Sequence, residues 1–188
     1  MFRALTLIIL LSLLQGCAAL VVAGGAGVAA AAHDRRSLGT QLDDKTASSR
    51  IYTQLSSDEA LSQRSHVSVN VFNGIALLVG QTPSDGDKQQ IAALAAQVPN
   101  IRKIHNQIRV AKPTAPSTRA HDIWLQSKVK TLLLTDKRVD GLHIEVVVED
   151  GEVFLMGLVN EDEAAVAVDI ARNTSGVAQV IKAFEYRS

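Results

Sequence analysis

The sequence has little of what catalysis or covalent cross-linking needs. It contains one cysteine, so no disulfide can form within the chain. The histidines are scattered, and none pairs with another at the spacing of a helical zinc site. The small-residue run at 24–27 is followed by neither a helix pattern nor a lysine, so it is not a phosphate-binding loop, and no nucleophile elbow is present. We therefore expect a protein that is not an enzyme and holds no metal and no cofactor.

Charge of one sign is also lacking. The chain has 19 Lys and Arg against 19 Asp and Glu, and removal of residues 1–16 takes away only Arg3. A balanced total gives no general attraction for phosphate backbones, so nucleic acid is not an expected partner. Aromatic residues make up only 4% of the chain, with a single Trp, Trp124. An exposed Trp would therefore carry more weight than usual as an interaction residue.

The N-terminus has the pattern of a secretion signal. Arg3 is followed by an apolar run of about ten residues, Leu5 to Leu14, and by the sequence Leu14-Gln15-Gly16-Cys17. A membrane-spanning helix needs about 20 apolar residues. The apolar run resumes over 18–32, so the spanning alternative stays open.

The sequence from Leu14 to Cys17 resembles the lipobox of bacterial lipoproteins, with Gln15 as its one departure. The resemblance implies that the signal 1–16 is removed and that Cys17 is acylated on its thiol and on its new amino terminus. The other interpretation is an ordinary signal peptide with a chance cysteine. Ala18, in place of an aspartate, implies the outer membrane as destination. Residues 17–45 are then a lipidated terminus and a tether.

The rest of the chain contains an internal repeat. The offset of 77 residues maps Asn73-Gly74 onto Asp150-Gly151, Gly80 onto Gly157, and Leu55 onto Leu132. It also maps one set of alternating apolar residues, Val67, Val69 and Val71, onto another, Ile144, Val146 and Val148. The sequence therefore predicts two copies of one domain.

Each copy has the same predicted order of elements. A helix, at about 46–60 or 119–135, precedes a strand with apolar residues at period two. Asn-Gly or Asp-Gly then favours a type I′ hairpin turn into a second strand. A helix follows at 85–98 or 161–173, and a last strand at 103–110 or 179–186. Each order, helix-strand-strand-helix-strand, predicts an α+β two-layer sandwich with two helices on one face of a small sheet.

The predicted domains are 46–111 and 119–188, joined by the linker 112–118. Two prolines stiffen this short linker, so we expect the domains to lie close to or against each other.

Three segments resemble the BON domain family: 36–44 before the first domain, 77–81 within it, and 151–159 in the second. The mature chain as a whole resembles lipoproteins of the outer membrane that carry two BON domains. That resemblance implies a periplasm-facing protein that binds anionic phospholipid, such as phosphatidylglycerol or cardiolipin, through its second domain. It also implies gathering at division sites and support of envelope integrity alongside the outer-membrane protein assembly machinery.

The segment 119–135 holds the candidate binding residues. Helical spacing places Val129, Leu132 and Leu133 on the sheet and leaves Trp124, Lys128 and Leu134 outside that stripe. Trp suits the depth of lipid headgroups, and Lys128 and Lys130 suit their phosphates. The plain structural alternative is that Trp124 caps the core. The family's phospholipid-binding helix is similar at Trp124, Lys128, Val129 and Leu134.

Two functions remain open from the sequence. One is a lipid-binding module. The other is an adaptor that docks on the outer-membrane protein assembly machinery or another envelope complex, with lipid contact incidental. The offset of 77 places Ala47 opposite Trp124 in the first copy. We therefore predict that only the second domain carries the aromatic anchor.

Overall fold

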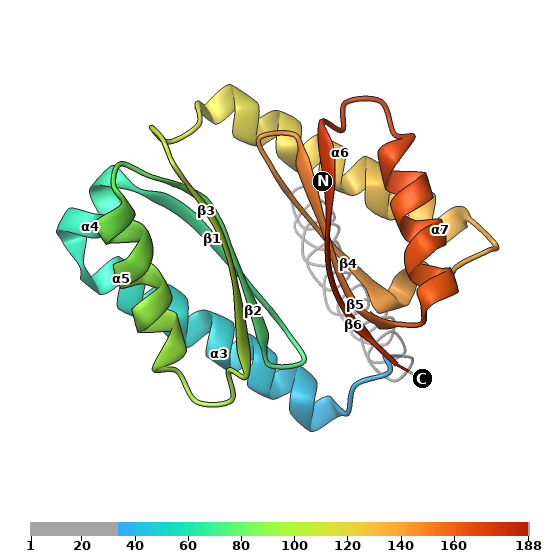
Figure 1. Cartoon of the computed structure of the whole chain (residues 1–188), viewed down its shortest axis with the longest axis horizontal. Coiled ribbons are helices and arrows are strands. Elements are labelled where there is room, and N and C mark those ends of the chain that lie inside the picture. The colour runs from blue at the N-terminus through green and yellow to red at the C-terminus, as the bar shows by residue number, and fades with distance from the viewer. Residues whose placement is uncertain (1–33, 188) are drawn as a thin grey trace, which may run out of the picture. The chain divides into compact units, whose positions relative to one another are not determined.

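The computed structural model describes residues 34–187 (Figure 1). The predicted signal peptide, the lipidation at Cys17 and most of the tether lie outside the described residues. No helix in the described part of the chain has the length and apolar character needed to cross a membrane.

The first domain contains three helices and three strands. Their bounds are α3 Leu38–Ser57, α4 Glu59–Arg64, β1 His66–Phe72, β2 Ile75–Thr82, α5 Asp85–Ala96 and β3 Lys103–Val110. The sheet has the order β1-β2-β3, in which β1 pairs antiparallel and β3 parallel with the central strand.

The second domain repeats this order. Its elements are α6 Pro116–Thr135, the 3₁₀ turn η1 Gly141–His143, β4 Ile144–Glu149, β5 Glu152–Val159, α7 Glu161–Arg172 and β6 Gln179–Tyr186. The sheet order β4-β5-β6 and the pairing directions match those of the first domain. The predicted α+β fold is confirmed. The first domain differs from the prediction in its short extra helix α4, because Asp58 ends α3 and caps a new helix by accepting from the Leu61 amide.

Both hairpin turns have the predicted backbone. Asn73 and Gly74 have φ angles of 49° and 71°, and Asp150 and Gly151 have 50° and 74°. Two consecutive residues at positive φ define the type I′ turn, whose twist matches that of the flanking strands.

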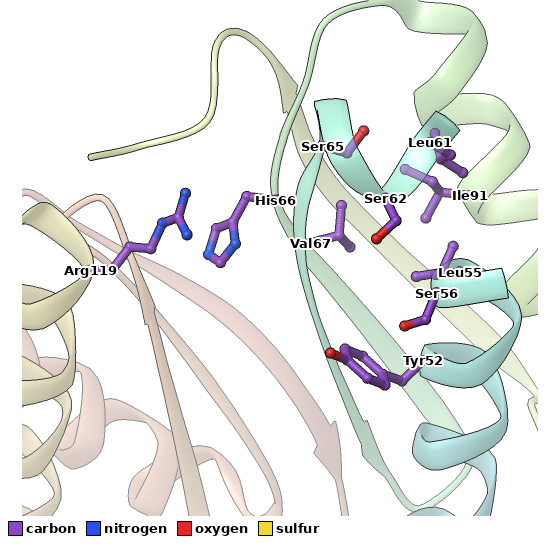
Figure 2. Close-up of a pocket in the computed structure, with 10 residues that line it drawn as sticks. All are labelled: Tyr52, Leu55, Ser56, Leu61, Ser62, Ser65, His66, Val67, Ile91 and Arg119. Atoms are coloured by element: carbon purple, nitrogen blue, oxygen red, sulfur yellow. The ribbon is translucent and has the colours of Figure 1, made fainter. Parts of the chain in front are cut away.

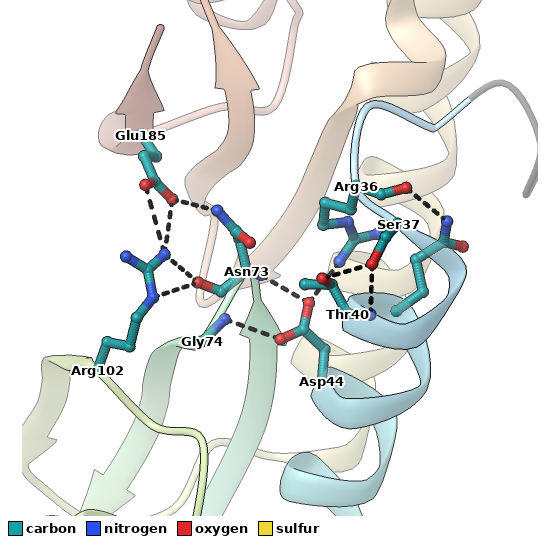
Figure 3. A network of polar contacts seen from close by, with 9 residues as sticks. Arg36, Ser37, Thr40, Asp44, Asn73, Gly74, Arg102 and Glu185 are labelled. Carbon is teal, nitrogen blue, oxygen red and sulfur yellow. Dashed lines mark hydrogen bonds and ion pairs between the residues drawn. The ribbon is translucent and has the colours of Figure 1, made fainter.

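A buried carboxylate from the first helix of each domain holds the hairpin. Asp44 accepts hydrogen bonds from the backbone amides of Asn73 and Gly74 at 2.6 and 2.8 Å (Figure 3). Asp122 does the same for the amides of Asp150 and Gly151, at 2.8 and 2.9 Å. The helix and the hairpin of each domain are therefore joined by two charge-assisted hydrogen bonds.

The first helix of each domain starts earlier than predicted. α3 begins at Leu38, ahead of the predicted residue 46, because Ser37 caps it by accepting from the Thr40 amide at 3.0 Å. α6 begins at Pro116, ahead of residue 119, because proline suits the first turn of a helix. Apolar spacing did not reveal either start, since the first turns bury no apolar side chain.

The structure also corrects the repeat register within these helices. The buried residues of α3 are Asp44, Ala47, Ile51 and Leu55, and those of α6 are Asp122, Leu125, Val129 and Leu133. The offset in the first helices is therefore 78, because the second copy is one residue shorter between this helix and the first strand. The first two strands keep 77, and the last strands, β3 and β6, have an offset of 76. Leu55 corresponds to Leu133, and Leu132, predicted to pack on the sheet, is 40% exposed.

The two sheets pack against each other through the faces that the helices leave uncovered (Figure 1). In β2, Ala76 and Leu78 face the core of their own domain, while Leu77 and Val79 belong to a shared cluster with β5. That cluster contains Phe72, Ile75, Leu77, Val79, Val147, Phe154, Met156 and Ala183. The central strands are thus buried on both faces, and the expected contact between the domains is confirmed.

Polar contacts surround this apolar layer. Arg102 from the first domain forms an ion pair with Glu185 of the second at 3.0 Å, and Asn73 donates to the same carboxylate at 2.7 Å (Figure 3). Elsewhere at the interface the buried Gln81 donates to Glu149 at 2.7 Å. These pairs set the register in which the two sheets meet.

Candidate lipid-binding face of α6

The second domain's first helix divides into a buried and an outward side. Leu125, Val129 and Leu133 are fully buried against the sheet. On the outward side, Ile123, Trp124 and Leu134 are 69%, 52% and 48% exposed. Together with Lys128 we call these three residues the α6 outer face. Trp124 does not cap the core, since half of it is open to solvent.

Trp124 lies between two polar side chains. The ammonium of Lys128 lies 4.8 Å from the centre of the indole ring, at cation–π distance. The imidazole of His121 lies on the ring at 5.4 Å between centroids, tilted by 34°. Lys128 also donates to the carbonyl oxygen of Ser175 at 3.0 Å. The indole is therefore held in place with a positive charge beside it.

The hydroxyl groups on this side of α6 form hydrogen bonds with the backbone of the helix. The hydroxyl groups of Ser127, Thr131 and Thr135 donate to carbonyl oxygens one turn earlier, at 2.8 to 3.0 Å. The one carboxylate of α6, Asp122, is buried on the hairpin amides. The outward side of α6 therefore presents apolar and cationic groups and no exposed carboxylate of its own.

Lys130 lies in a different environment from the rest of the predicted set. Its ammonium donates to the carbonyl oxygens of Gly141 and Ile144, at 2.8 and 2.5 Å. Burial lowers its pKa, against the opposing effect of Glu145 and Asp140. Of the four predicted residues, the structure therefore brings Trp124, Lys128 and Leu134 to the outward side and fastens Lys130 to the backbone.

Sequence reasoning did not select Ile123 or His121. Ile123 is the most exposed large apolar residue in the described part of the chain. Its position directly before Trp124, off the core stripe, is the signal that would have identified it. His121 has no such signal, because its contact with the indole depends on side-chain geometry.

The equivalent face of the first domain is different. With the corrected offset of 78, α3 carries Lys45, Thr46, Arg50 and Ser56 where α6 carries Ile123, Trp124, Lys128 and Leu134. Thr46, and not Ala47 as expected from the offset of 77, therefore lies opposite Trp124. The outward side of α3 keeps a cation at the Lys128 position but has no apolar side chain at these four positions.

Within 34–187 no cluster of three His, Cys, Asp or Glu residues is placed to hold a metal ion.

Comparison with known proteins places these observations in a family. The BON domain model matches residues 43–112 and 121–188. Outer membrane lipoprotein DolP of Haemophilus influenzae is 38% identical over 92% of this chain and 90% of its own length. The 21 kDa hemolysin of Actinobacillus pleuropneumoniae is 35% identical over 81% of this chain and 79% of its own.

The solved structures that align with the chain share little sequence with it. The C-terminal domain of CdsD, a structural protein of the type III secretion system of Chlamydia trachomatis, aligns with a TM-score of 0.32 at 11% identity, over 74% of this chain and 96% of that one. The two matched domains and the extent of the sequence identity show that the chain belongs to the BON domain family and is a DolP-like protein with two BON domains.

Proposed function

We propose that this chain is a non-catalytic lipoprotein of the outer membrane, anchored through Cys17 and facing the periplasm, whose α6 outer face binds anionic phospholipid. One observation carries the proposal. Trp124, the only Trp, is half exposed with the ammonium of Lys128 over its ring, on a helix whose one carboxylate is buried.

The chemistry of the face suits the headgroup layer of a bilayer. An indole buries its apolar body at headgroup depth, and Ile123 and Leu134 add exposed apolar surface on the same helix. A lysine near an anionic surface contributes about 1 kcal/mol. Each contact is weak, but an acyl anchor keeps the face close to the bilayer, so a weak second contact is sufficient.

The proposed location rests on the lipobox-like segment and on the relatives. One of them carries the name of an outer membrane lipoprotein and matches nearly the whole chain. Support of envelope integrity, with gathering at division sites, extends this proposal. Fluorescence imaging of a tagged chain in dividing cells tests that extension: diffuse staining of the whole envelope, equal in wild type and Trp124→Glu, would contradict it.

A fluorescence titration tests lipid binding directly. Because Trp124 is the only Trp, the emission of the chain reports on the α6 outer face alone. Vesicles of phosphatidylglycerol are expected to shift the emission to the blue in low salt, and phosphatidylcholine vesicles are not. Lys128→Gln should weaken the effect, whereas Arg50→Gln, which removes the equivalent charge of the first domain, should leave it unchanged. A shift of the same size with both lipids would contradict charge-dependent binding.

A second candidate function is an adaptor that docks on the outer-membrane protein assembly machinery or another envelope complex. Leu38 and Leu42 favour it, since they lie one turn apart at the start of α3 and are 62% and 66% exposed. Chemical cross-linking in cells distinguishes the two functions. If Leu42→Glu abolishes a cross-linked partner while the fluorescence shift with phosphatidylglycerol persists, docking is a separate function. If every cross-link survives this change, the adaptor function through α3 is excluded.

A further inference from the structure

The first domain contains a cavity that lipid binding by α6 does not use. It has a volume of about 350 Å³ and lies between the end of α3, α4 and the start of β1 (Figure 2). This volume is within the range of small-molecule sites in proteins. One wall comes from the other domain, since Arg119 of α6 also lines the cavity.

The lining separates into an apolar floor and a polar rim. The floor consists of core side chains, Leu55, Leu61, Val67 and Ile91. The rim carries the hydroxyl groups of Tyr52, Ser56, Ser62 and Ser65, together with His66 and Arg119 (Figure 2). Ser65 is occupied, because its hydroxyl donates to Thr82 at 3.0 Å. Ligand sites in proteins usually combine an apolar lining with a few polar groups, as this cavity does.

Arg119 supplies the rim with a fixed positive charge. Its Nη2 donates to the carbonyl oxygen of Thr114 at 2.8 Å and its Nε to the hydroxyl of Thr114 at 3.4 Å. These partners are neutral, so they orient the guanidinium without neutralising it. Figure 2 shows Arg119 pointing toward His66.

The carboxylate beside His66 already has a hydrogen-bond partner. Glu149 accepts from Gln81 at 2.7 Å and lies 3.9 Å from Nε2 of His66. Burial and the charge of Arg119 lower the pKa of His66, with Glu149 and Asp122 opposing. The lowered pKa of His66 favours its neutral form, and Arg119 is the permanent cation of the rim.

The second domain shows how the same fold is built with a cation in this place. By the offset of 78, Tyr52 corresponds to Lys130, whose ammonium donates to the carbonyl oxygens of Gly141 and Ile144. In the first domain the position carries Tyr52, which is 62% exposed. The second copy therefore carries a cation where the first carries an exposed tyrosine ring and hydroxyl.

We propose that this cavity binds a small phosphorylated polyol, with Arg119 on the phosphate, the rim hydroxyls on the polyol and the floor against its carbon atoms. A guanidinium matches the oxygen geometry of phosphate with paired donors. Hydroxyl groups both donate and accept, as a polyol requires. Because Arg119 belongs to α6 and the rest of the lining to the first domain, the ligand would bridge the two domains.

Calorimetric titration of the full chain in a neutral detergent, with glycerol 1-phosphate as the probe, tests the proposal. We expect saturable binding that Arg119→Gln weakens at least tenfold, equivalent to about 1.4 kcal/mol. Arg50→Gln removes the same charge from an exposed position of α3 and should bind as wild type. Glycerol alone and inorganic phosphate should each bind more weakly than the ester. No saturable heat with wild type, or equal affinity in both arginine variants, would overturn the proposal.

Two further variants keep the result clear. Tyr52→Phe removes one rim hydroxyl and keeps the ring, so it should fold and should weaken binding of the ester; unchanged affinity would contradict the assignment of this hydroxyl to the site. Trp124→Glu should leave binding of the free ester intact, which separates this site from the α6 outer face. The phosphorylated polyol could be a lipid headgroup or a free ester, and a titration of the Trp124→Glu variant with phosphatidylglycerol micelles distinguishes them. Binding heat that Arg119→Gln abolishes would show that the cavity takes the lipid headgroup. No such heat would show that the cavity takes the free ester alone.

Discussion

The two carboxylates that hold the hairpins give a direct test of the structure. Replacing Asp122 by Ala removes the acceptor for the Asp150 and Gly151 amides. A hydrogen bond to a charged group contributes about 1.5 to 3 kcal/mol. Since the freed amides lie near the surface and water can reach them, the lower figure applies to each. We expect Asp122→Ala to lower the free energy of unfolding by about 3 kcal/mol.

Asp44→Ala should lower the free energy of unfolding by more than Asp122→Ala does. Asp44 accepts from two amides and also forms an ion pair with Arg36 at 2.8 Å, in which both side chains are largely buried. Replacing Asp44 also removes this buried ion pair from Arg36, which adds to the loss. The exposed neighbour Asp43 provides a matched control, and Asp43→Ala should stay within about 0.5 kcal/mol of wild type.

Urea unfolding followed by circular dichroism and by Trp124 emission measures these effects. With a typical slope of about 2 kcal/mol/M, a loss of 3 kcal/mol moves the midpoint down by roughly 1.5 M. A change below about 0.5 kcal/mol for Asp122→Ala would refute the reasoning, because it would mean that the carboxylate does not hold the hairpin.

Three other changes test separate parts of the fold. Arg35 donates to Glu163 and holds the pKa of that carboxyl at about 2, below its ordinary 4.5. The stabilisation from this pair is therefore present above pH 4.5 and is lost as the pH falls toward 2. Glu163→Gln should make the free energy of unfolding less dependent on pH over that range, and the same pH dependence in variant and wild type would contradict this. Gly80 has a φ of +128°, and a Cβ there would lie 2.0 Å from the carbonyl oxygen of His66. Gly80→Ala should therefore lower the free energy of unfolding by more than about 1 kcal/mol in thermal unfolding. An unchanged stability would contradict the close approach. Phe154 is buried between the two sheets, so Phe154→Ala should cost about 3 to 5 kcal/mol in urea, and a loss below 1 kcal/mol would mean that the sheets do not pack there.

The element order could be predicted from the sequence because its signals are local. Alternation in β1 and β4, the Asn73-Gly74 and Asp150-Gly151 turns, and the apolar spacing of α5 and α7 each follow from neighbouring residues. The repeat strengthened these predictions, because the same pattern is unlikely to arise twice in one chain by chance. The helix starts and the register of α3 and α6 were missed because polar groups determine them, namely Ser37 at a cap and Asp44 and Asp122 on the hairpins.

The candidate site was only partly predictable. Trp124 and Leu134 stood out because they depart from the core stripe, and both are exposed. Lys130 could not be separated from Lys128 by spacing, since its two carbonyl partners follow α6 in chain order and approach only in the folded domain. The cavity beside Tyr52 had no signal in the sequence, because its lining comes from both domains.

The measurement that tests the central claim most directly is a chemical-shift titration of the non-acylated chain, residues 33–188. The protein is mixed with micelles of phosphatidylglycerol or of neutral phosphatidylcholine. The account predicts shifts confined to 119–135 and to the segment around Ser175 that Lys128 contacts, with the anionic lipid alone. No selective shifts in this region, or the same shifts with both lipids, would contradict recognition of anionic phospholipid by the α6 outer face and leave the adaptor function as the better explanation.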